Sequence, residues 1–266
     1  MPKPCGIENY RSFEKTVPKL LESIGAPAVL ARQSRILIKP NLVNGDPPPV
    51  TLPVEACAAL VKACRTWSSA EIVIAEGTGA RHLTTSEMFR LHRYDRLAEK
   101  EGVKLVDLNE ADLIELEDPG CSVFPVFQMP RLVMESFVLS AAVLKAHSLA
   151  VITGSMKNMI GVAPPAYYQK GGHWKKSAFH HQMQTSVFEL NCYRKPDLAF
   201  IDASVGLAEY HLGGPTCDPP VDKLVAGFDP VAVDAAAAAL LGIGWRQVGH
   251  LLKAHGVLGF AEPEEI

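Results

Sequence analysis

Ionisable side chains follow five short apolar runs of the sequence, at the points where buried strands would end. The five runs deliver Lys39 with Asn41, Glu76, Lys145 with His147, Asp202 and Asp229. Lysine or histidine could hold an anion, and a carboxylate could ligate a metal or accept a proton. Ligands of open α/β sheets bind outside the carboxyl ends of the strands. We therefore predict that four of these side chains face one cavity, namely Lys39, Glu76, Lys145 and Asp202.

A second candidate segment runs from Thr153 to Gly161 and reads TGSMKNMIG. Its small residues would let the backbone approach a ligand, and the free amides of a helix that starts there would favour an anion. Lys157 would supply the counter-charge, beside Thr153 and Asn158. The spacing matches neither the phosphate loop of nucleotide hydrolases nor a Gly-x-Gly-x-x-Gly motif. The segment predicts binding of a phosphate, carboxylate or nucleotide, with an ordinary helix start as the alternative.

Charge is unevenly distributed around this segment. Residues 136–188 contain five lysines and four histidines but no aspartate or glutamate, so their formal charge is +5 against −8 for the rest of the chain. A buried strand explains part of this deficit of acids. The local positive field favours an anionic small-molecule ligand, and Tyr167, Tyr168 and Trp174 could form flat walls of its pocket.

Histidines in the same segment raise the question of a metal site. His147 and one later histidine, together with Glu76 or Asp202, could form a mixed nitrogen and oxygen site for zinc, iron or nickel. The later histidines are His173, His180 and His181. No His-Glu-x-x-His spacing supports such a site, so a divalent metal remains an open alternative. A serine hydrolase is disfavoured because the sequence has no Gly-x-Ser-x-Gly motif.

Six cysteines are scattered along the chain without any Cys-x-x-Cys pair. The sequence therefore predicts neither a disulfide framework nor an iron–sulfur cluster of its own.

Alternating strands and helices must position these side chains. Strand-like runs at 35–40 and 71–75 flank a helical pattern over 54–67, which predicts a parallel pair with a right-handed crossover. Further strands are predicted at 103–108, 137–144, 197–201 and 224–228, and helices at 85–102 and 230–241. The order predicts an α/β fold, a mainly parallel sheet flanked by helices in Rossmann-like layers. An irregular insertion rich in Gly, His and Lys is expected near 161–182.

Length and composition set the remaining limits. The 266 residues are 48% hydrophobic and 21% charged, which is typical of an ordinary globular protein, and we expect one α/β domain over 1–266. A net charge of −3 offers no bulk attraction for nucleic acid or an anionic membrane. The apolar runs are far shorter than the ~20 residues that span a bilayer, and no signal core follows Met1, so we expect a cytoplasmic protein.

Five motifs, in this order, resemble the family called domain of unknown function 362 (DUF362). They are ILIKPNLV at 36–43, AEG at 75–77, LKAHS at 144–148, TGSMKNMIG at 153–161 and GFDPVAVD at 227–234. Asp202 and the Gly-Gly-Pro turn at 213–215 also fit the family pattern. The resemblance covers about residues 30 to 245 and identifies the chain as a member.

The resemblance implies little about chemistry, since members are described mainly as iron–sulfur or ferredoxin-related proteins. Many members carry a cluster-binding module with closely spaced cysteines, which this sequence lacks, so any electron carrier would be a ferredoxin-like redox partner. The family motifs contain most of the candidate residues, together with Asp229 and Asp234. Asp229 precedes Pro230, where the N-cap of a helix belongs, so we predict a capping role for it.

The sequence therefore predicts a cytoplasmic enzyme that binds an anionic small molecule or cofactor at the carboxyl edge of its sheet. Glu76 or His147 would act as acid, base or metal ligand, with Asp202 orienting it. The expected ligand-binding residues are Lys39, Asn41, Lys145, Thr153, Lys157 and Asn158. The alternative is a non-catalytic protein that binds an anion or a metal and serves an iron–sulfur redox partner.

Overall fold

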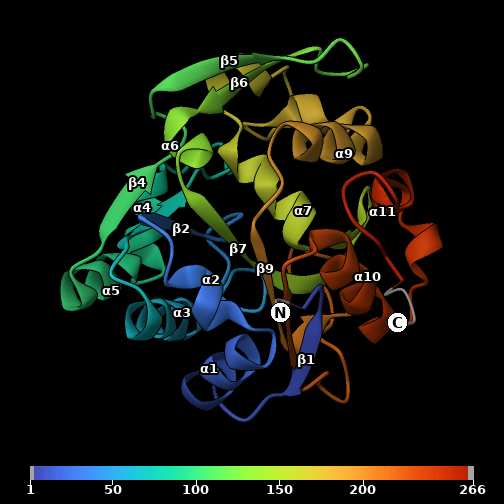
Figure 1. The fold of residues 1–266 in the computed structure, drawn as a ribbon. Coiled ribbons are helices and arrows are strands. Elements are labelled where there is room, and N and C mark those ends of the chain that lie inside the picture. The colour runs from blue at the N-terminus through green and yellow to red at the C-terminus, as the bar shows by residue number, and fades with distance from the viewer. Residues whose placement is uncertain (1–2, 263–266) are drawn as a thin grey trace.

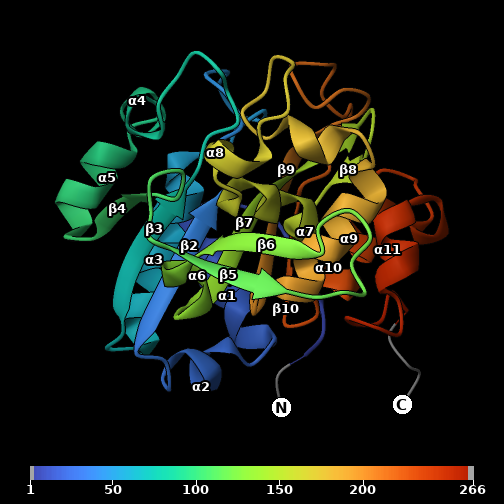
Figure 2. The same ribbon diagram turned by 90° about the horizontal axis from the view of Figure 1, so that it is seen from above.

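A computed structural model describes residues 3–262 (Figure 1). Its main sheet has eight strands in the order β1-β10-β9-β7-β2-β3-β4, with β8 paired to β7. The strands are β1 (Gly6–Asn9), β2 (Arg35–Pro40), β3 (Glu71–Glu76), β4 (Lys104–Asp107), β7 (Phe137–His147), β8 (Val151–Thr153), β9 (Leu198–Leu207) and β10 (Lys223–Gly227). A separate hairpin consists of β5 (Leu113–Glu117) and β6 (Val126–Pro130), seen from above in Figure 2.

Five adjacent strands of the main sheet, β9, β7, β2, β3 and β4, run parallel to one another. The predicted α/β fold with a mainly parallel sheet is therefore confirmed. β1, β8 and β10 run antiparallel to their neighbours. The expectation that Asp229 joins the other strand ends is wrong, because β10 is reversed and delivers Asp229 to the opposite edge.

Helices cover both faces of the sheet. One face packs against α1 (Phe13–Ser23), α2 (Ala26–Leu30), α3 (Val54–Trp67), α4 (Thr85–Leu91) and α5 (Tyr94–Glu101). The other elements are α6 (Arg131–Met134), α7 (Ser155–Asn158), α8 (Pro165–Tyr168), α9 (Met183–Tyr193), α10 (Pro230–Leu240) and α11 (Gly249–Ala254), with 3-10 turns at 159–162, 177–180 and 245–247. The helix predicted over 85–102 is two helices, because Arg93 adopts a left-handed φ of 63° between them.

Alternation along the buried strands decides which face each side chain joins. Ile36 and Ile38 of β2 pack beneath α1 and α3, while Leu37 packs on the opposite face. Lys39 continues the second series and lies fully buried at the end of the strand. The strand thus carries a lysine into the interior next to the edge where the parallel strands end.

The insertion at 161–182 folds into short helical turns rather than an open loop. Tyr168 and Phe179 anchor it, because both are buried against Phe127 of the hairpin. The Tyr168 hydroxyl accepts a hydrogen bond from the Gln128 amide at 2.8 Å. The segment therefore has a fixed position above the carboxyl edge of the sheet. No helix among residues 3–262 has the length and apolar character needed to cross a membrane.

Candidate functional site

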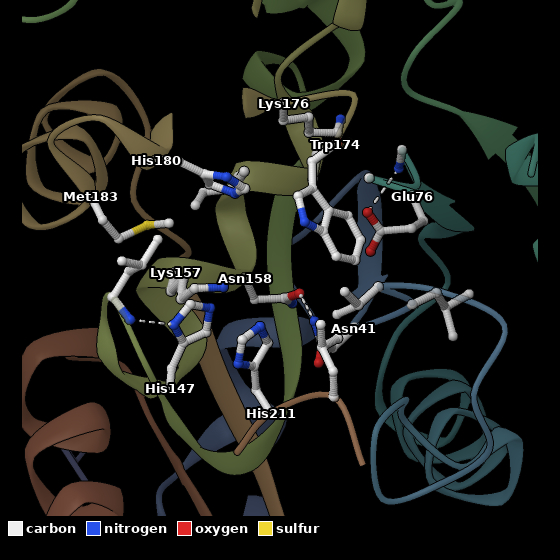
Figure 3. A pocket seen from close by; sticks show the side chains of 18 of the residues that line it. Asn41, Glu76, His147, Lys157, Asn158, Trp174, Lys176, His180, Met183 and His211 are labelled. Atoms are coloured by element: carbon white, nitrogen blue, oxygen red, sulfur yellow. Dashed lines mark hydrogen bonds between the residues drawn. The ribbon is translucent and has the colours of Figure 1, made fainter. Parts of the chain in front are cut away.

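A pocket of about 230 Å³ lies at the carboxyl edge of the parallel strands (Figure 3). Its walls come from strand ends, from α7 and the turn after it, from the insertion, and from the loop that follows β9. Its polar lining residues are Lys39, Asn41, Glu76, His147, Ser148, Lys157, Asn158, Trp174, Lys176, His180, Tyr210 and His211. The pocket thus brings together four residues predicted at strand ends and two predicted ligand-binding residues of the Thr153–Gly161 segment. They are Lys39, Asn41, Glu76 and His147, and Lys157 and Asn158.

A buried ion pair forms one wall of the pocket. Lys39 Nζ lies 2.7 Å from Glu76 Oε2, and the two side chains are 1% and 3% exposed. Glu76 Oε1 also accepts a hydrogen bond from the Gly77 amide at 2.8 Å. Burial lowers the pKa of Lys39, and the neighbouring Glu76 carboxylate partly offsets that effect. The positive charge of Lys39 is therefore already balanced within the protein.

Two asparagines connect this pair to a second buried lysine. Lys145 Nζ donates to Asn41 Oδ1 and to the Val50 carbonyl, both at 2.7 Å. Asn41 Nδ2 then donates to Asn158 Oδ1 at 3.1 Å, and Lys39 Nζ donates to the same oxygen at 3.2 Å. Burial places the pKa of Lys145 well below its ordinary value. Lys145 thus fixes Asn41 from behind the pocket wall.

Asp234 holds the short helix α7 in position beneath the pocket. Its carboxylate accepts hydrogen bonds from the Ser155 amide, the Ser155 hydroxyl and the Met156 amide, at 2.7, 2.7 and 3.0 Å. Burial raises the pKa of Asp234 to about 6, although these three hydrogen bonds oppose the shift. At the other end of α7, Asn158 Nδ2 donates to the Lys39 carbonyl at 3.1 Å. Lys157 is therefore carried on a helix that is fixed at both ends.

Lys157 extends into the pocket between these two anchors (Figure 3). Within residues 3–262, its Nζ has no hydrogen-bonding partner and no ion pair. Burial, and then the positive charge of Lys39, lower the pKa of Lys157 to about 8. Its ammonium form thus predominates at pH 7 and is available to an anion.

His147 is held in one tautomer by the backbone. Its Nδ1 accepts hydrogen bonds from the amides of Leu149 at 3.0 Å and Ala150 at 3.2 Å, so the proton of the neutral ring lies on Nε2. Its ring stacks on His211, with centroids 3.6 Å apart and planes at 16°. Burial lowers the pKa of His147 far below its usual value and that of His211 to about 3, with Lys157 as a second cause for both. Both imidazoles are therefore neutral at pH 7.

Trp174 and Lys176 lie on the part of the insertion that borders the pocket, residues 174–176, which we call the strap. Lys176 Nζ donates to Asn109 Oδ1 and to the carbonyls of Gly161 and Ala163, at 2.8, 2.8 and 2.6 Å. Burial lowers the pKa of Lys176 to about 7. Its three neutral acceptors satisfy the ammonium, so this lysine connects the strap to the turn after α7.

Comparison with known proteins agrees with the sequence motifs. A model of the family described as domain of unknown function (DUF362) matches residues 36–239. The chain belongs to the DUF362 family. No curated protein matches it.

Among solved structures, this DUF362 chain is similar to the lactate racemase apoprotein from Thermoanaerobacterium thermosaccharolyticum. The TM-score is 0.54 at 14% sequence identity, and the match covers 84% of this chain and 54% of that one. The chain thus spans about half the length of that protein. A likeness at this identity shows a shared α/β fold and nothing finer.

The structure separates the nine candidate residues of this DUF362 chain into six that line the pocket and three that do not, namely Lys145, Thr153 and Asp202. Six line the pocket, namely Lys39, Asn41, Glu76, His147, Lys157 and Asn158. Lys145 lies behind the wall, and Thr153 is buried with its hydroxyl unpaired among residues 3–262.

Asp202 is the clearest departure from the prediction of one shared cavity. It lies on the same side of β9 as Leu198 and Phe200, which pack against the helices on the other face of the sheet. Its carboxylate accepts a hydrogen bond from the Ser204 amide at 2.9 Å. His147 is oriented by the backbone amides of Leu149 and Ala150, which take the role predicted for Asp202.

The two remaining aspartates of the motifs have structural positions. Asp229 caps α10, since its Oδ1 accepts from the amides of Val231 and Ala232 at 2.8 and 3.3 Å, which confirms the predicted cap. Asp234 anchors α7 as described above. Of the three expected aromatic walls, Trp174 lines the pocket, Tyr168 lies in the core, and Tyr167 lies outside the lining set.

Sequence reasoning did not find His211, although its ring stacks directly on His147. It follows β9 and precedes the Gly213–Pro215 turn, so the family motif was the only signal close to it. Lys176 is one of the five lysines of the basic segment at 136–188, and no sequence signal sets it apart from the others.

A metal site is not supported by the described residues. Among residues 3–262, no three His, Cys, Asp or Glu side chains lie close enough together to hold an ion. His147 also lacks a free Nδ1, because two amides occupy it, and Lys39 binds the Glu76 carboxylate. Two of the donors expected to form a mixed nitrogen and oxygen site, His147 Nδ1 and the Glu76 carboxylate, are therefore engaged with other partners.

Proposed function

We propose that this protein is an enzyme that binds a small organic anion at Lys157 and transfers a proton between that anion and the imidazoles beside it. The observation that carries the proposal is the Lys157 ammonium, which projects into the pocket with no partner in the described part of the chain. A half-buried ammonium without a counter-ion is costly, and an anionic ligand would remove that cost.

The other lysines near the pocket support this assignment because each has its own partner. Lys39 binds Glu76, Lys145 binds Asn41, and Lys176 binds three neutral oxygens. Glu76 balances the charge of Lys39, whereas Lys145 and Lys176 bind neutral oxygens and, when protonated, add to the local positive field that attracts an anion. Lys157 is thus the group that best supports direct contact with the ligand.

His147 and His211 support the proton-transfer part of the proposal. The neutral His147 ring presents Nε2–H as a donor, because its Nδ1 is occupied by two amides. The Nδ1 atom of His211 is buried without a partner among residues 3–262. The Nδ1 atom of His211 can accept a proton from the bound anion and return it, because a negative charge beside the ring raises the pKa that burial lowers. The Nε2–H group of His147 donates a hydrogen bond to the same anion.

Replacing Lys157 with methionine should weaken binding of small carboxylates by about tenfold to a hundredfold, the cost of one charge-assisted hydrogen bond. Isothermal titration calorimetry with a panel of carboxylates measures this change. Lys170→Met is the matched control, because Lys170 is an exposed lysine of the same basic segment and lies outside the pocket lining. Equal affinities of wild type and Lys157→Met would contradict the proposal.

The pH dependence of binding provides a second readout of the same lysine. Since the ammonium form holds the anion and its pKa is about 8, affinity should fall as pH rises through 8. Lys157→Arg should retain binding above pH 9, because a guanidinium stays protonated there. A wild-type affinity that is flat from pH 7 to 9 would count against contact with Lys157.

Deuterium exchange separates an enzyme from a binding protein. We expect the protein to catalyse exchange of carbon-bound protons of a bound carboxylate with D₂O, measured by NMR. His211→Gln, which removes the proton acceptor, should slow this exchange by about 10²-fold or more. His181→Gln is the control, because that exposed histidine lies outside the pocket lining. Tight binding without exchange would favour the non-catalytic alternative. A ferredoxin-like redox partner stays a prediction.

The likeness to the lactate racemase apoprotein supports the α/β fold of the protein but not the proposed chemistry. At 14% identity the comparison says nothing about individual side chains. The proposal therefore rests on Lys157 and the two imidazoles.

A further inference from the structure

Trp174 forms a fixed, flat wall on one side of the pocket. The residue pairs with Ala80 in an antiparallel bridge, and the next amide, of Lys175, donates to the Gly79 carbonyl at 2.9 Å. Lys175 Nζ also donates to the Leu83 carbonyl at 2.6 Å. These contacts tie the strap to the loop after β3 at Trp174 and at the next residue. The backbone that carries the indole is thus held in place before any ligand arrives.

The indole lies beside that loop at Gly79. A Cβ atom added at this glycine would lie 3.8 Å from Cε3 of Trp174, an ordinary contact distance, so the space between the ring and the loop is about that of one methyl group. The rest of the ring borders the pocket (Figure 3). The strap therefore presents an aromatic surface to whatever occupies the pocket.

The stacked imidazoles of His147 and His211 form the facing wall. Trp174 and His211 point toward the same space from opposite sides in Figure 3. His211 also contacts Tyr210, with ring centroids 4.8 Å apart at 64°. Because both imidazoles are neutral, this wall behaves as an uncharged aromatic surface.

We propose that the ligand of this pocket is a planar aromatic ring that carries one anionic group. The ring would lie between the Trp174 indole and the His147–His211 stack, with its anionic group on Lys157. This inference rests on the proposed function and adds the class of ligand to it.

One anionic group is expected because, of the three lysines that line the pocket, Lys157 is the one without a partner among residues 3–262. A ring is expected because two rigid aromatic walls favour a flat π-system over an aliphatic group of similar size. The small volume of the pocket also limits the ligand to one ring with short substituents.

Benzoate and cyclohexanecarboxylate provide the matched probes, since they share the charge and differ in the planarity of the ring. We expect benzoate to bind at least about tenfold more tightly by calorimetry, from two aromatic contacts. Phenyl phosphate, as a third titrant, shows which anionic group Lys157 prefers on the same ring. Equal affinity for benzoate and cyclohexanecarboxylate would overturn the inference.

Trp174→Leu should remove the preference for the flat ring while leaving the dependence on Lys157 intact. Trp245→Leu is the control, since that indole lies outside the pocket lining and packs near His255. A chain with Trp67→Phe and Trp245→Phe keeps Trp174 as its sole tryptophan, and its emission should change on addition of benzoate but not of cyclohexanecarboxylate.

The outcomes separate this inference from the proposed function. If both acids bind equally and both need Lys157, the aromatic class is wrong and the anion site stands. If neither acid binds and Lys157→Met changes nothing, both proposals fail. A benzoate preference that survives Trp174→Leu would also contradict the ring position.

Discussion

Replacing Glu76 with leucine should lower the free energy of unfolding by about 3–5 kcal/mol, the largest loss expected from a single side chain of this site. The change leaves Lys39 with no carboxylate at a position that is 1% exposed. The Asn158 Oδ1 atom, 3.2 Å from Lys39 Nζ, is the hydrogen-bond acceptor that remains for it. An isolated buried ammonium must either stay charged at high cost or lose its proton.

Urea denaturation followed by circular dichroism measures this loss. The double variant Lys39→Met/Glu76→Leu should recover much of it, because replacing both members of a buried pair with apolar side chains is often close to neutral. Glu71→Leu is the matched control, since Glu71 forms exposed ion pairs with Arg35 and Lys104 and should lose far less.

The alternative outcomes test distinct parts of the argument. If Glu76→Leu matches Glu71→Leu, the pair does not stabilise the fold and Lys39 accommodates burial without it. If the double variant is as unstable as Glu76→Leu, the loss comes from packing at the strand end rather than from an uncompensated charge. The double variant therefore separates charge from shape.

The sequence predicts the strand framework well because local patterns determine it. Apolar β-branched runs form β2 and β3, and the helical spacing between them forms α3, as expected. Strand ends then place Lys39, Glu76 and His147 at one edge, since parallel strands end together. These residues follow from the strand ends and connection order, without knowledge of distant contacts.

Other parts of the site depend on pairing and orientation, which local patterns do not determine. Asp202 lies on the face of the sheet opposite to the predicted one, because alternate side chains of a strand point to opposite faces. The prediction took account of the end of the strand but not of this alternation. β10 runs antiparallel, which removes Asp229 from the pocket edge. His211 reaches His147 across 64 positions in sequence, a contact set by tertiary structure alone.

Gly161→Ala is the second variant with a large expected effect, and its loss should approach that of Glu76→Leu. A Cβ atom at Gly161 would overlap Glu76 Oε1 and Lys39 Nζ, and it would lie 2.5 Å from Lys39 Cε. All three atoms are buried, so the pair must separate or the turn after α7 must shift. Breaking the pair costs about 3–5 kcal/mol, and overpacking alone costs about 1–3 kcal/mol.

Urea denaturation of Gly161→Ala should therefore show a loss of at least 2 kcal/mol, roughly the middle of the overpacking range. Gly244→Ala is the control, because its added Cβ would lie 3.7 Å from Gln247 Oε1, an ordinary contact in an exposed turn. Neither glycine has a left-handed φ, so the comparison isolates crowding from backbone strain. Anion binding should fall along with stability, since the same turn carries α7 and Lys157. Normal stability in Gly161→Ala would show that the turn moves freely away from the ion pair, and would remove the steric link between the pair and the pocket.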